Sequence, residues 1–135
     1  MKCAPAVFAA LLLSAPAEAQ PSSGLTAEQE YGYFSDARNS CLNAARRNSF
    51  REAECHADES GRLYTRLDLA YRAAMNRLPS EAARARLRTE HEAWRQTVGD
   101  GCRNSDDQYR GSEHARVLCG QFQVISRIAR LERPI

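Results

Sequence analysis

Lysine is almost missing from this chain of 135 residues, since Lys2 is the only one and arginine supplies the other basic side chains. Aromatic residues are few, at 7%. No sign of charge dominates, because the formal net charge is only +2, and this balance argues against a protein that binds nucleic acid through phosphate contacts. Hydrophobic residues at 43% and charged residues at 27% form an ordinary globular balance, which argues against a disordered chain. The length suits one domain.

The motifs of common catalytic and cofactor sites are also missing. Glu90-His91-Glu92 resembles part of a zinc-protease helix, but Arg95 stands where the second histidine would be required. The chain has no G-x-S-x-G elbow, no glycine-rich phosphate loop and no C-x-x-C pair. We therefore predict no catalytic residue, no metal site and no cofactor.

The N-terminus has the pattern of a secretory signal peptide. Lys2 is followed by an apolar run over Ala4–Leu13, which is too short to span a bilayer. Ala17-Glu18-Ala19 has the small-x-small form of a cleavage site, so we predict a signal peptide over 1–19 that is cut after Ala19. A membrane anchor is the less favoured alternative, and no stable anchor is expected after cleavage. A flexible Pro/Ser/Gly leader over 20–25 and one domain over 26–135 follow.

Four cysteines remain after the predicted cleavage, and an even number in an exported chain indicates two disulfides. Cys41 and Cys55 flank one expected helix connection, and Cys102 and Cys119 flank another. Of the three connectivities, we favour the local pairs Cys41–Cys55 and Cys102–Cys119. A zinc site is the disfavoured alternative, because the spacing and the oxidising compartment both argue against it.

Apolar residues recur at helical spacing in four stretches, and none of the chain alternates like a strand. We expect an all-α, four-helix bundle-like domain with helices over 26–45, 50–78, 81–98 and 113–131. Whether the second helix is interrupted near Ser60-Gly61 stays open, and Gly32 is a weak point of the first. The expected N-terminal caps are Thr26 with Gln29, Ser49 with Glu52, and Ser80.

The last two helices carry the most informative side chains. His91 shares an apolar helix face with Trp94, so we expect a partly buried structural histidine rather than a ligand. The apolar face of the last helix is predicted from Ala115, Leu118, Cys119, Phe122, Ile125 and Ala129. Arg127 and Arg130 near its C-terminus are expected to complement the helix dipole. The many arginines favour a solvated surface interleaved with glutamates over recognition of a carboxylate or polyanionic sugar.

The spacing of several residues resembles the LprI-like lysozyme-inhibitor domain family of small exported bacterial proteins. Its frame has two cysteines, a Leu-Asn-x-x-Tyr motif, a Trp eight residues before a third cysteine, and a fourth cysteine followed by Arg and Leu. Asp68 stands where the family usually has Asn, and His91 where it has Gln. The matching residues are Cys41, Cys55, Leu67, Tyr71, Trp94, Cys102, Cys119, Arg127 and Leu131.

The resemblance implies an exported, periplasmic or secreted protein that inhibits a lysozyme by stoichiometric binding and has no catalytic activity. An immunity or stress protein against another cell-wall hydrolase is the alternative, and an enzyme that acts on cell-wall material is the third choice. The expected partner is thus a protein, either lysozyme or another peptidoglycan hydrolase.

A binding segment can be proposed on physical grounds. An inhibitor has to enter a cleft that holds two catalytic carboxylates, and a preorganised projection loses less entropy on binding. The segment 103–118 would be such a projection if a disulfide closes it. Its expected contacts are Asp106, Asp107, Tyr109 and Arg110, with Arg110 facing a carboxylate of the cleft.

Overall fold

The computed structural model describes residues 24–102 and 114–133, and the predicted signal peptide 1–19 lies outside this part of the chain. The described residues form helices and connecting turns, without a β-strand. The prediction of a small all-α domain is therefore confirmed. The elements are α1 (Ala27–Tyr31), α2 (Asp36–Ala45), α3 (Ser49–Arg77), α4 (Glu81–Thr97), the 3-10 turn η1 (Asp100–Cys102) and α5 (Ala115–Glu132).

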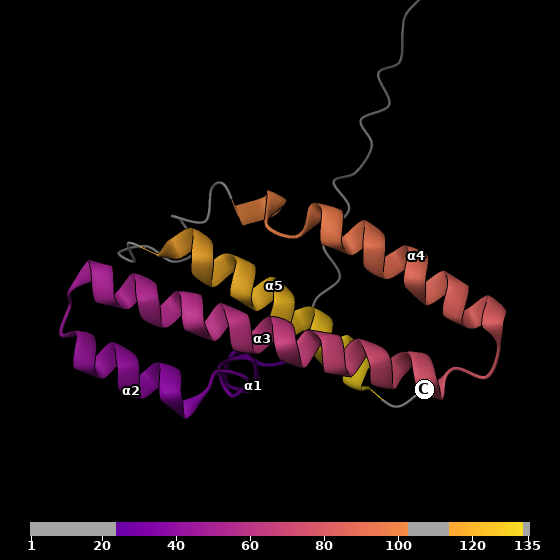
Figure 1. Cartoon of the computed structure of the whole chain (residues 1–135), viewed down its shortest axis with the longest axis horizontal. Coiled ribbons are helices and arrows are strands. Elements are labelled where there is room, and N and C mark those ends of the chain that lie inside the picture. The colour runs from indigo at the N-terminus through magenta and orange to yellow at the C-terminus, as the bar shows by residue number, and fades with distance from the viewer. Residues whose placement is uncertain (1–23, 103–113, 134–135) are drawn as a thin grey trace, which may run out of the picture.

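The long helix α3 and the helix α5 form the centre of the molecule and run in the same direction (Figure 1). The helices α2 and α4 both run opposite to them (Figure 1). α2 packs along the first half of α3, and α4 lies along its second half. The two outer helices therefore cover different halves of the central pair.

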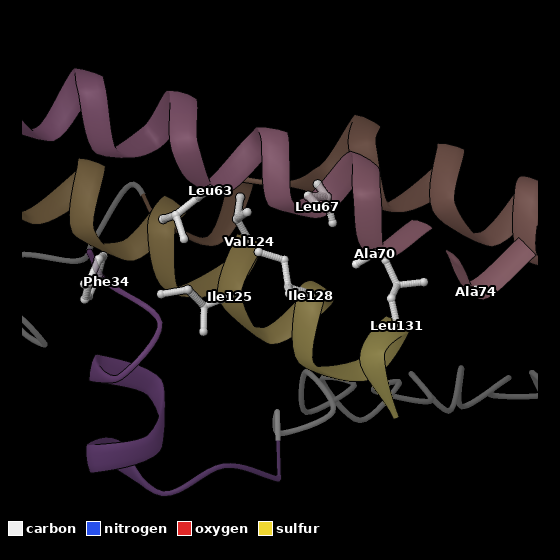
Figure 2. Packing of buried hydrophobic residues seen from close by; sticks show 9 residues of the cluster. All are labelled: Phe34, Leu63, Leu67, Ala70, Ala74, Val124, Ile125, Ile128 and Leu131. Atoms are coloured by element: carbon white, nitrogen blue, oxygen red, sulfur yellow. The ribbon is translucent and has the colours of Figure 1, made fainter. Parts of the chain in front are cut away.

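The hydrophobic core lies where α3 and α5 face each other (Figure 2). Ile125 and Ile128 are completely buried, and Leu63 and Leu67 are each 2% exposed. Burying one such side chain stabilises the fold by about 1.5–3 kcal/mol. The core also contains Phe34, Ala70, Ala74, Val124 and Leu131. Of the predicted leader 20–25, only its last two residues are described, and Leu25 packs against this core.

The first predicted helix is divided in two, so the prediction of one helix over 26–45 is wrong. Its N-terminal cap is confirmed, because Thr26 and Gln29 form both hydrogen bonds of a capping box. The helix ends at Tyr31, however, and α2 starts after a new cap at Ser35. The break turns Phe34 into the core, where it is 7% exposed.

The other helix boundaries follow mostly from local signals. Ser80 caps α4 by accepting a hydrogen bond from the Ala83 amide, as predicted. The cap at Ser49 is wrong, because the side chain of Asn48 accepts the bond and Ser49 is already helical. α3 continues without interruption through Ser60-Gly61.

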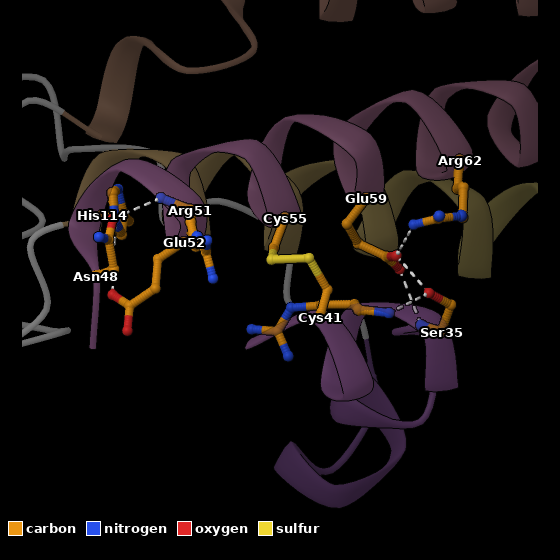
Figure 3. The surroundings of a disulfide bond; sticks show 10 residues. Ser35, Cys41, Asn48, Arg51, Glu52, Cys55, Glu59, Arg62 and His114 are labelled. Atoms are coloured by element: carbon orange, nitrogen blue, oxygen red, sulfur yellow. Dashed lines mark hydrogen bonds and ion pairs between the residues drawn. A yellow bond between two sulfur atoms is a disulfide. The ribbon is translucent and has the colours of Figure 1, made fainter. Parts of the chain in front are cut away.

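Both predicted disulfides are present. Cys41 and Cys55 join α2 to α3, with Cα atoms 5.7 Å apart (Figure 3). Cys102 and Cys119 join η1 to α5, with Cα atoms 5.6 Å apart. Such bonds are typical of proteins outside the reducing cytoplasm. Among the described helices, none has both the length and the apolar character needed to cross a bilayer.

The predicted apolar face of α5 is mostly confirmed, because Ala115, Cys119, Ile125 and Ala129 are buried. Leu118 and Phe122 are only partly buried. The buried face is wider than predicted, since it also includes Val124 and Ile128, which belong to the hydrophobic core. Of the two arginines expected to complement the helix dipole, Arg130 lies in the last turn of α5. Arg127 lies one turn earlier and is buried, at 4% exposed.

Candidate functional site

The predicted contact residues Asp106, Asp107, Tyr109 and Arg110 lie outside the described residues. The structure does describe both flanks of their segment. On one flank, Cys102 is bonded to Cys119. On the other, the ring of His114 lies 4.9 Å from that of His56, and its Nε2 atom is 3.8 Å from a carboxylate oxygen of Glu52 (Figure 3). Both flanks are thus fixed to the helical body.

Three of the residues that carry the family resemblance meet at one place beneath α4. The ring of Tyr71 on α3 stacks on His91 at 4.3 Å, and His91 stacks on Trp94 at 5.6 Å. The guanidinium of Arg127 on α5 lies 5.9 Å from the Trp94 ring. We call Tyr71, Glu90, His91, Trp94 and Arg127 the seam cluster, because it joins α4 to the central pair.

The seam cluster has one charged centre. Arg127 donates a hydrogen bond to the carboxylate of Glu90 at 2.6 Å and another to Nδ1 of His91 at 3.4 Å. Burial lowers the pKa of His91, and the nearby charges of Arg127 and Arg95 lower it further. The histidine therefore stays neutral at pH 7 and accepts the hydrogen bond from the arginine. The sequence prediction of a structural histidine is consistent with this geometry.

The remaining two residues of the resemblance, Leu67 and Leu131, belong to the hydrophobic core. Apart from the cysteines, five residues carry the resemblance. Each of them therefore belongs either to the hydrophobic core or to the seam cluster. The sequence analysis considered Glu90 only as part of the rejected zinc-protease pattern and did not predict that it pairs with Arg127. No local signal could have shown this, because Arg127 lies on another helix, 37 residues along the chain.

Two hollows flank the seam cluster, one on each side of α4. The larger, of about 710 Å³, lies beside Tyr71 and His91 and is lined by polar residues of α4. The smaller, of about 290 Å³, lies where the ends of α3 and α5 meet α4. The smaller hollow is lined by Ala74, Arg77, Leu78, Ala83, Arg86, Leu87, Glu90, Arg130, Leu131 and Arg133.

A second buried polar group lies between α2, α3 and α5. Glu59, at 1% exposed, accepts hydrogen bonds from the backbone and the hydroxyl of Ser35 and from Arg62 (Figure 3). His56 lies one turn earlier on α3 and is 5% exposed. Burial lowers its pKa to about 4, and Arg38 and His114 contribute to the shift. This group ties α2 to α3.

The described residues contain no group of three His, Cys, Asp or Glu side chains that could hold a metal ion. The groups present can bind a partner: the seam cluster provides neutral aromatic surface, and guanidinium groups surround the smaller hollow. No protein-family model, no curated protein and no solved structure matches this chain.

Proposed function

We propose that this protein is exported and inhibits a lysozyme-type peptidoglycan hydrolase by forming a stoichiometric complex, without catalysing a reaction itself. A signal peptide cut after Ala19 would deliver it to the periplasm or the extracellular space. The two disulfides support a compartment outside the reducing cytoplasm.

One observation carries the proposal. Tyr71, Trp94 and Arg127 all belong to the set of residues whose spacing resembles the LprI-like family, and they come from three different helices. They nevertheless converge in the seam cluster. This convergence supports the resemblance at the level of the fold, and the family's activity is then the best-supported function.

The contact surface proposed for the inhibitor is the segment that the Cys102–Cys119 disulfide closes. The closure brings the Cα atoms of its two ends to 5.6 Å. Fixed ends reduce the conformational entropy that a segment loses on binding. Tyr109 would supply apolar contact area, and Arg110 would pair with a carboxylate of the cleft.

Isothermal titration calorimetry of the oxidised protein without residues 1–19 tests the proposal against animal-type and goose-type lysozymes. We expect binding with one-to-one stoichiometry to at least one of them. Tyr109→Ala and Arg110→Ala should each weaken the complex by about tenfold or more, as contact residues of an interface do.

The double variant Asp106→Ala/Asp107→Ala has a matched control on the helical body. Glu54→Ala/Asp58→Ala removes the same number of carboxylates from exposed positions of α3. We expect the first to weaken binding and the second to leave it unchanged. Equal effects of the two double variants on binding would contradict the assignment of the contact segment. Absence of binding to both lysozymes at tens of micromolar protein would contradict the proposed function.

A further inference from the structure

The smaller hollow is strongly cationic. Four of its lining residues are arginines, namely Arg77, Arg86, Arg130 and Arg133, and only Glu90 is acidic. That carboxylate already accepts a hydrogen bond from Arg127 at 2.6 Å, so its charge is largely balanced from outside the hollow. Arg130 and Arg133 have interactions of their own within the chain, so the guanidinium charge offered to a ligand is mainly that of Arg77 and Arg86.

The remaining lining is apolar. It consists of small and aliphatic side chains from three helices: Ala74, Leu78, Ala83, Leu87 and Leu131. Leu131 and Ala74 belong to the hydrophobic core, so the hollow ends on the core itself. A ligand that fits both surfaces has an anionic head and an apolar tail.

The ends of the helices do not account for all of this charge. Arg77 donates a hydrogen bond to the carbonyl of Leu131, as basic residues near helix C-termini do. That bond uses one of the five N–H groups of its guanidinium. Arg86 lies in the second turn of α4 and so does not belong to either of the helix C-termini that line the hollow, and no carboxylate in the described part of the chain pairs with it.

We propose that this hollow binds a small anion that carries a short apolar group, either a carboxylate or a phosphate monoester. Guanidinium groups bind both heads through paired hydrogen bonds. Its volume of about 290 Å³ suits a ligand smaller than a typical drug. Arg77 and Arg86 hold the head from opposite helices, and Leu87 contacts the tail. None of the residues that line the hollow belongs to the segment proposed to contact lysozyme.

Calorimetric titration of the protein without residues 1–19, in the absence of lysozyme, tests the site with defined probes. Hexanoate and hexyl phosphate carry both head and tail, acetate and inorganic phosphate carry the head alone, and hexanol carries the tail alone. We expect hexanoate to bind more tightly than acetate and hexanol, or hexyl phosphate to bind more tightly than inorganic phosphate and hexanol. The tighter of hexanoate and hexyl phosphate identifies the preferred head.

Two variants locate the binding. Arg86→Ala should weaken the bound probe by about tenfold, the loss of one charge-assisted hydrogen bond. Arg51→Ala removes an exposed arginine at the opposite end of α3 and should change binding by less than about twofold. Ala83→Glu places a carboxylate among the arginines and should abolish binding, while the backbone bond from its amide to Ser80 remains available.

The circular dichroism spectrum shows that each variant is folded before it is titrated. The proposal is overturned if neither hexanoate nor hexyl phosphate binds at millimolar concentration. It is also overturned if binding survives both Arg86→Ala and Ala83→Glu in folded protein. Because no lysozyme is present, these outcomes are independent of the proposed inhibition.

Discussion

At the scale of single residues, the ion pair between Arg127 and Glu90 is buried on one side only. The arginine side chain is 3% exposed, whereas the glutamate is 64% exposed. Removing the glutamate would leave a buried guanidinium whose remaining hydrogen-bonded side chain is a neutral histidine. An exposed pair contributes little, but an uncompensated buried charge is costly.

We therefore expect Glu90→Gln to lower the free energy of unfolding by about 1–2 kcal/mol, measured by urea denaturation. Glu92→Gln is the matched control, because Glu92 is exposed on the same helix and has no ion pair within the described residues. It should change stability by less than about 0.5 kcal/mol. Similar effects of the two substitutions would show that the buried arginine does not depend on Glu90.

His56 makes the stability depend on pH. Its pKa in the folded protein is about 4, against 6.5 for an unperturbed histidine, so the unfolded chain binds a proton between these values that the folded protein does not bind. The free energy of unfolding should therefore fall as the pH decreases from about 6.5 toward 4, by about 1–3 kcal/mol from this group.

His56→Gln tests this directly, because glutamine does not titrate. We expect the curve of melting temperature against pH to be flatter for the variant between pH 6.5 and 5, where most carboxylates are still ionised. His91, whose pKa is also lowered, retains part of the slope in both proteins. Parallel curves for the two proteins would contradict the assignment to His56.

At the scale of the helices, replacing each of two glycines by alanine is expected to change the stability in opposite directions. Gly61 lies inside α3, and a Cβ atom there would meet no other atom within 4 Å. Gly99 follows α4 with a φ of 91°, which side chains other than glycine rarely adopt. We expect Gly61→Ala to raise the free energy of unfolding by about 0.5–1 kcal/mol, and Gly99→Ala to lower it.

Thermal and urea unfolding of the two alanine variants measures this difference. The substitution adds the same methyl group in both, so opposite signs would arise from the backbone conformation alone. A loss of stability in Gly61→Ala would show that α3 is not a regular helix at this point.

The helices also show what the sequence can predict. The capping signals at Thr26 and Ser80 lie within four residues of the helix starts that they define, so both were predicted correctly. The break before Ser35 was missed because its cause is distant: the buried carboxylate of Glu59 binds the Ser35 backbone and hydroxyl from another helix. Local patterns contain no information about such a partner.

The same limit applies to the candidate site. The apolar spacing placed His91 and Trp94 on one face of α4, and the resemblance added Tyr71 and Arg127. The cationic hollow was not predicted, since its arginines lie on three helices and only the packing brings them together. The segment with Asp106 to Arg110 was predicted from the cysteine spacing and stays a prediction.

At the scale of the whole molecule, each disulfide joins two elements that also pack against each other. Cys41–Cys55 holds α2 against α3, and Cys102–Cys119 holds the end of the α4–η1 unit against α5. Each closes a loop of similar length, with sequence separations of 14 and 17 residues. The chain-entropy model gives each about 3 kcal/mol.

Replacing either cysteine pair by serine should therefore lower the free energy of unfolding by about 3 kcal/mol, measured by urea denaturation in the absence of reductant. The variant without Cys102–Cys119 should also bind lysozyme more weakly than the variant without Cys41–Cys55, because only the former releases the contact segment. Equal binding by both folded variants would contradict a role for the closed segment.

The central claim is that the whole molecule blocks a cell-wall hydrolase, and a turbidity assay of lysozyme activity tests it most directly. The oxidised protein without residues 1–19 is titrated into animal-type and goose-type enzymes acting on a suspension of bacterial cell walls. We predict that clearing stops as the protein approaches equimolar amounts with at least one enzyme. Unchanged clearing by both enzymes at tens of micromolar protein would contradict the proposed function.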